Sequence, residues 1–101
     1  MSDFAASLDR LLTQVRHWEE VRWAAPAGSG TKADLAYGLV QRLADLSAEA
    51  EGRAARAVPR MHDLVLPDQL RVVADDLLAA APTEDVLAHA TEAVNEVRSA
   101  V

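Results

Sequence analysis

Residues 31–50 read TKADLAYGLVQRLADLSAEA and carry the longest helical pattern in the chain. At about 100° per residue, the large apolar side chains of this stretch fall on one face of an α-helix. They are Leu35, Leu39, Leu43 and Leu46, followed by Ala50. Thr31 is a typical N-cap, and Asp34 three residues later completes a capping box. The pattern predicts a helix over 31–57 that ends before Pro59, because proline disfavours helix at the residue before it.

The opposite side of this helix carries a second apolar stripe where charged residues would be usual. Its members are Ala33, Tyr37, Val40, Ala44 and Ala48. The high helix propensity of alanine is enough to explain the three alanines. It does not account for Tyr37 and Val40. The stripe therefore predicts a second packing surface, either against another chain or against a neighbouring helix of the same chain.

Three further segments show the same helical periodicity, over 2–23, 66–81 and 83–101. Pro67 suits the first turn of the third helix. Thr83 is the predicted N-cap of the fourth. Short connections favour antiparallel neighbours, so the sequence predicts an all-α, up-down-up-down four-helix bundle. We expect a single helical domain over 1–101, with the first two helices longer than the last two.

Composition limits the classes of partner. The net charge of −6 argues against binding to nucleic acid or to an anionic membrane surface, since both need basic surface. The chain has no cysteine, its first residues do not resemble a signal peptide, and no apolar run approaches the ~20 residues of a membrane span. These features predict a cytoplasmic protein. Arginine far outnumbers lysine and alanine is abundant, which is typical of a GC-rich bacterial genome.

A glycine-rich loop, Gly28-Ser29-Gly30-Thr31-Lys32, raises the possibility of a phosphate site. A Walker A loop needs glycine directly before lysine and a strand before the loop. Here Thr31 separates Gly30 from Lys32, and the preceding segment is helical. We interpret the loop as a hinge and expect no nucleotide to bind there.

The titratable residues form no catalytic motif, and we expect no metal and no cofactor. His17 with Glu20, and His89 with Glu92, have the spacing of one helix face. Neither pair has the converging carboxylates of a di-metal bundle.

Arg53, Arg56 and Arg60 form a basic patch in this acidic chain. The favoured interpretation is that they pair with the protein's own acids. Binding of an acidic partner or a phosphate is the alternative.

The end of the first helix combines residue types that are enriched in interface hot spots, Arg22 and Trp23. The apolar stripe weakens there, because Glu19 and Arg22 lie where it should continue. Trp23 has two open interpretations, an interface residue or a plug over the core.

These observations predict a protein–protein interaction module that acts as a homodimer. The candidate interface residues are Arg22, Trp23, Ala33, Tyr37, Val40, Ala44 and Ala48. The alternative is a small-molecule or enzymatic site at the Trp23 end, lined by Arg22, Glu19 and Trp23. A different protein partner is also compatible with the interface.

Overall fold

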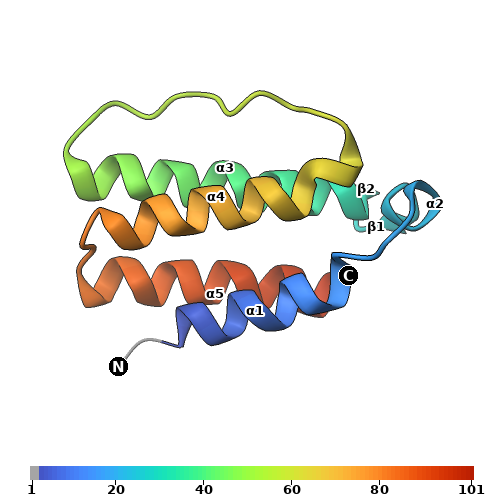
Figure 1. The fold of residues 1–101 in the computed structure, drawn as a ribbon, viewed down its shortest axis with the longest axis horizontal. Coiled ribbons are helices and arrows are strands. Elements are labelled where there is room, and N and C mark those ends of the chain that lie inside the picture. Colours follow the sequence, from blue (N-terminus) through green and yellow to red (C-terminus); the bar gives the residue numbers. More distant parts are fainter. Residues whose placement is uncertain (1–2) are drawn as a thin grey trace.

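The computed structural model describes residues 3–101 and is almost entirely helical (Figure 1). Its helices are α1 (Phe4–Val15), α2 (Glu20–Trp23), α3 (Lys32–Glu51), η1 (Asp63–Val65, a 3-10 turn), α4 (Leu66–Ala79) and α5 (Glu84–Ala100). Two short strands, β1 (Pro26–Ala27) and β2 (Gly30–Thr31), pair antiparallel between α2 and α3. The sequence analysis did not predict this small hairpin. The all-α class is confirmed.

The apolar stripes predicted from periodicity form the core. Phe4, Leu8, Leu11 and Val15 of α1 are buried against residues of the other long helices. These residues include Leu39, Val40 and Leu43 of α3, Leu66, Leu70 and Leu77 of α4, and Val94 of α5. Helix α3 packs against both α4 and α5, and α1 packs against α5. The ion pair between Arg71 and Asp9, at 3.1 Å, links α4 to α1.

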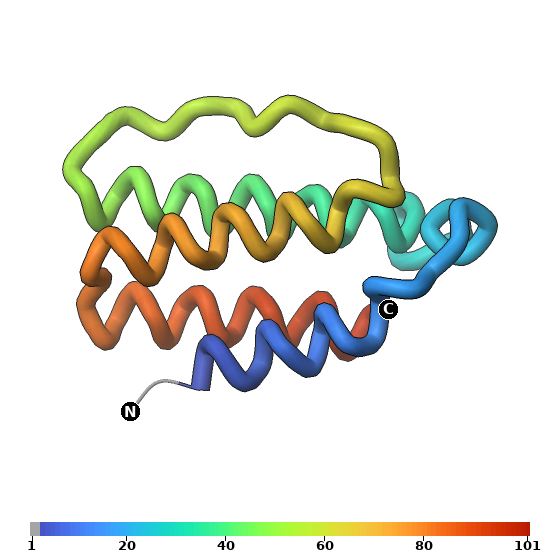
Figure 2. The backbone as a smooth tube through the Cα atoms, in the orientation of Figure 1, coloured from blue at the N-terminus to red at the C-terminus, as the bar shows by residue number. Residues whose placement is uncertain are grey.

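The order of the helices differs from the predicted up-down-up-down bundle. After α3, residues 53–62 run back along that helix in an extended conformation and bring the chain to the end where α3 began (Figure 2). Helix α4 therefore starts beside the start of α3, and the two helices run parallel (Figure 1). Helices α1 and α5 run in the opposite direction. The bundle has a long crossover connection in place of a short turn.

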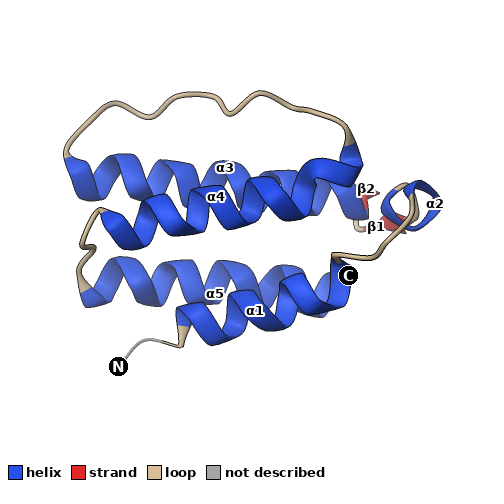
Figure 3. Ribbon diagram, viewed as in Figure 1, coloured by secondary structure: helices blue, strands red, loops and turns tan. Residues whose placement is uncertain are grey.

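We call residues 53–62 the strap; Figure 3 shows it as the longest loop of the described chain. The helix before it ends at Glu51 and not near residue 57 as predicted. Gly52 adopts a left-handed conformation, with φ of 69°, and closes the helix. Glycine at this position is a common helix terminator, and the sequence analysis missed that signal.

The predicted helix over 2–23 is also divided; its first residue lies outside the described residues. Helix α1 ends at Val15, and Glu19 is extended before the short helix α2 begins. No proline or glycine causes this break. It allows Trp18 and Trp23, which an unbroken helix would separate, to pack together with ring centroids 4.9 Å apart. The first helix is consequently the shortest of the four long ones, contrary to the prediction.

Candidate functional site

The strap is fixed to α3 by side chains that form hydrogen bonds with its backbone. Gln41 accepts a hydrogen bond from the Val58 backbone N–H at 2.8 Å and donates one to the Arg56 carbonyl oxygen at 2.9 Å. The Tyr37 hydroxyl donates to the carbonyl oxygen of Val58. On the α4 side, Gln69 donates to the Pro59 carbonyl oxygen at 3.1 Å. Polar backbone groups that are shielded from water need such partners.

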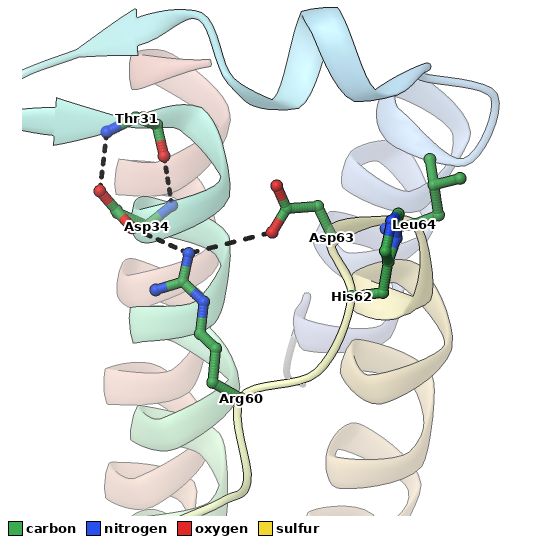
Figure 4. Close-up of polar contacts among 6 residues, drawn as sticks. All are labelled: Thr31, Asp34, Arg60, His62, Asp63 and Leu64. Carbon is green, nitrogen blue, oxygen red and sulfur yellow. Dashed lines mark hydrogen bonds and ion pairs between the residues drawn. The ribbon is translucent and has the colours of Figure 1, made fainter.

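The end of the strap is held by Asp34 (Figure 4). One carboxylate oxygen of Asp34 accepts the Thr31 backbone N–H at 2.9 Å, and the other accepts Arg60 at 2.8 Å. The Thr31 hydroxyl in turn accepts the Asp34 N–H at 3.1 Å, which confirms the predicted capping box. The Thr31 N–H and then the Arg60 guanidinium lower the pKa of Asp34. Asp34 thus joins the start of α3 to the strap.

The second stripe of α3 faces other parts of the same chain. Ala33, Val40 and Ala48 are buried, with Val40 0% exposed, while Tyr37 and Ala44 are half-buried against the core. Of the two explanations considered for the stripe, packing within one chain accounts for these positions. The sequence pattern could not separate the two, because an apolar stripe looks the same whether its neighbour is the same chain or another.

Trp23 acts as a plug over the core, one of its two predicted roles. Its side chain is 1% exposed, and its indole N–H has no hydrogen-bond partner among the described residues. Arg22 is exposed, and its guanidinium lies 4.9 Å from the centre of the Trp18 ring. Lys32 lies 5.1 Å from the same centre. Cations over an indole ring are attracted by its quadrupole.

An open hollow of about 460 Å³ lies at this end. Glu19 and Arg22 line it together with Trp18, but the buried Trp23 does not. The exposed Arg22 and the half-buried Lys32 already contact the Trp18 ring. The aromatic surface that a ligand would use is thus already in contact with the protein's own side chains.

The glycine-rich loop forms the turn of the small hairpin. Gly28 has a positive φ of 60°, which favours glycine. A side chain at Gly30 would come within 2.5 Å of an Asp34 carboxylate oxygen. Lys32 donates to the Val101 carbonyl oxygen at 3.3 Å. The two glycines therefore have structural explanations, in agreement with the hinge interpretation.

The predicted histidine pairs are arranged differently. Glu20 pairs with His62, at 3.2 Å, and not with His17. His89 and Glu92 line a groove of about 350 Å³ between α3 and α5, together with Arg42. Within residues 3–101, no three histidine, aspartate or glutamate side chains are grouped so that they could hold a metal ion.

Two of the three arginines of the basic patch pair with the protein's own acids, as the favoured interpretation expected. Arg53 lies 2.8 Å from Glu51, and Arg60 lies 2.8 Å from Asp34. Arg56 has no ion pair in the described part of the chain. Its guanidinium is therefore available to a ligand.

Apolar side chains are exposed at the end of the molecule where α2 contacts η1. Val21 of α2 is 83% exposed, Met61 of the strap 58%, and Leu64 of η1 49%. At the same end, Nε2 of His62, the last residue of the strap, lies 3.2 Å from the Glu20 carboxylate of α2. We call Val21, Met61 and Leu64 the α2–η1 patch. The sequence analysis did not identify it, because Val21 lies 40 residues before Met61 and only the fold brings α2 against η1.

Comparison with known protein families, with characterised proteins and with solved structures returned no match to this chain. No helix in residues 3–101 is both long and apolar enough to cross a membrane.

Proposed function

We propose that the protein acts through protein–protein contact, and that the α2–η1 patch is its contact surface with a second copy of the chain. The observation that carries this proposal is the exposure of Val21 on α2 and of Leu64 on η1, which contact each other, with the exposed Met61 two residues before η1. Large contiguous apolar patches mark protein–protein interaction sites, and in this proposal the three side chains contribute to one such patch. A cytoplasmic location is part of the same proposal.

A two-fold axis through the patch would let it pair with its own copy. The carboxylate of Glu20 and the imidazole of His62 lie beside the apolar residues. In a self-complementary contact, the acid of one copy can meet the histidine of the other. Stable interfaces use about 20–30 residues from each partner. A patch centred on three side chains therefore favours a reversible, concentration-dependent dimer.

Sedimentation velocity across a concentration series tests the proposal. We expect wild type to shift from monomer to dimer and Leu64→Glu to stay monomeric. The matched control is Leu78→Glu, because Leu78 is 45% exposed but lies in the last turn of α4, at the other end of that helix. This control should dimerise like wild type. Circular dichroism confirms that both variants are folded.

A wild type that is monomeric at high micromolar concentration would overturn self-association. Equal loss of the dimer in Leu64→Glu and Leu78→Glu would show that the α2–η1 patch is not the contact surface. That result would indicate a general effect of added negative charge.

A further inference from the structure

A hollow of about 220 Å³ lies beneath the strap, between α3 and α4. Each of the three elements contributes lining residues: Ala44 and Ser47 from α3, Val73 and Asp76 from α4, and Arg53 and Arg56 from the strap. The hollow thus combines small apolar walls with charged groups. It is separate from the α2–η1 patch, and nothing below depends on that surface.

Ser47 is the first indication that this hollow holds a ligand. Its side chain is 1% exposed, yet its hydroxyl has no hydrogen-bond partner within residues 3–101. Buried hydroxyl groups are normally paired, since an unpaired one retains its desolvation penalty. A ligand oxygen in the hollow would supply the missing partner.

The two arginines are the second indication. Arg56 has no ion pair in the described chain, and Arg53 uses only its Nε, which donates to Glu51 at 2.8 Å. The Nη groups of both side chains remain free to bind a carboxylate through paired hydrogen bonds. Both arginines lie on the strap, whose course is fixed by Gln41 and Tyr37. Their backbone positions at the hollow are therefore well defined.

Asp76 limits which anions fit. It lines the same hollow and has no ion pair among the described residues. A ligand with a second negative charge would be repelled by this carboxylate. The lining therefore favours a monoanion over a dianion.

The size and the apolar walls of the hollow determine which group the ligand can carry besides its charge. A volume of about 220 Å³ is of the same order as the ~150 Å³ cavity that holds a benzene molecule, so it suits a small ligand. The side chains of Ala44 and Val73 present apolar surface. They suit a short branched hydrocarbon more than additional polar groups.

We propose that the hollow beneath the strap binds a small monocarboxylate with a compact apolar body. Arg56 and Arg53 hold the carboxylate, Ser47 donates a hydrogen bond to it, and Ala44 and Val73 contact the hydrocarbon part.

An NMR titration of the backbone amides with isovalerate tests this proposal on the intact chain. We expect saturable shifts at Ser47, Val58 and Val73. Isovaleramide, which has the same shape without the charge, should give no saturable shift. Succinate and inorganic phosphate should bind more weakly than isovalerate, because the first carries a second charge and the second lacks an apolar body.

Substitutions test which residues form the binding site. Arg56→Gln should weaken isovalerate binding at least about tenfold, since hydrogen bonds to a charged group contribute at least that factor. Arg42→Gln is the matched control, because Arg42 is exposed on α3 and lines the groove with α5. It should leave the affinity unchanged. Ala44→Leu should block binding by filling the hollow.

Three results would overturn the proposal. The first is the absence of saturable shifts with isovalerate at millimolar concentration. The second is equal binding of isovalerate and isovaleramide, or of isovalerate and phosphate. The third is an equal loss of affinity in Arg56→Gln and Arg42→Gln, which would show that only overall charge matters. Because Arg56 is exposed, its replacement leaves the core intact and keeps each outcome interpretable.

Discussion

Two of the neighbours of helix α3, which are helix α4 and the strap, are held against it in different ways. Helix α4 covers it with apolar side chains such as Leu70, and its own backbone groups are paired within the helix. The strap covers it without regular structure and depends on Gln41, Tyr37 and Asp34. The comparison shows that the helix is attached to α3 by apolar packing, whereas the strap is attached by side-chain hydrogen bonds. The predictions below test this difference.

The largest effect is expected for Val40→Glu, on the fully buried side of α3. A buried charge without a partner destabilises a protein by about 3–5 kcal/mol, which is a large part of the stability of a small domain. We expect the chain to lose cooperative unfolding in a thermal melt followed by circular dichroism. Arg42→Glu, at an exposed position of the same helix, is the control and should remain folded. A folded, monomeric Val40→Glu protein would contradict the burial of the stripe.

Gln41→Leu should release the strap while leaving the helices in place. The change removes the partners of the Val58 N–H and the Arg56 carbonyl oxygen, at an expected cost of about 1–3 kcal/mol. Hydrogen exchange should accelerate at Val58 much more than at Leu43 in the core, because opening is local. Gln14→Leu, an exposed position on α1, should change neither amide. Equal acceleration at Val58 and Leu43 would show that the strap and the helices open together.

Replacing glycine by alanine should change the free energy of unfolding in opposite directions at Gly52 and at Gly38. Gly52→Ala places a side chain at a φ of 69°, where the strap begins, and should destabilise the fold by about 1 kcal/mol. Gly38→Ala lies within α3, where an added methyl group meets no atom within 4 Å. It should stabilise the fold by about 0.5–1 kcal/mol. Urea unfolding measures both effects. If both variants changed the stability in the same direction, the backbone conformations given for the two glycines would be wrong.

The smallest effect is expected for Asp34→Asn, at the end of the strap, and it should depend on pH. The pKa of Asp34 is lowered in the folded state, so its charge stabilises the fold above the ordinary value of 3.8. This contribution is lost as the pH falls through the lowered pKa. Asp34→Asn should therefore melt below wild type at neutral pH, with a gap that narrows below about pH 3.8. Asp68→Asn is compared with Asp34→Asn, because it also removes one carboxylate from the first turn of a helix, here α4. A gap that stays constant with pH would exclude the charge as its cause.

The sequence by itself determined the features that depend on residues a few positions apart. The apolar stripes of the helices follow from their 3.6-residue period, and the capping box of Thr31 and Asp34 and the N-cap at Thr83 are local hydrogen bonds. The hinge interpretation of the glycine-rich loop rested on similarly local signals. These features need no knowledge of distant partners.

The tertiary structure alone decided the path of the strap, the break before α2 and the sites that follow from them. Tyr37 and Gln41 meet Val58 only after the chain has folded back, and Trp18 packs on Trp23 only with the break in place. The hollow with Ser47 and Arg56 and the α2–η1 patch likewise combine elements far apart in the sequence. Periodicity identifies which face of a helix is apolar. It does not identify the neighbour that covers it, because that depends on the packing of the whole chain.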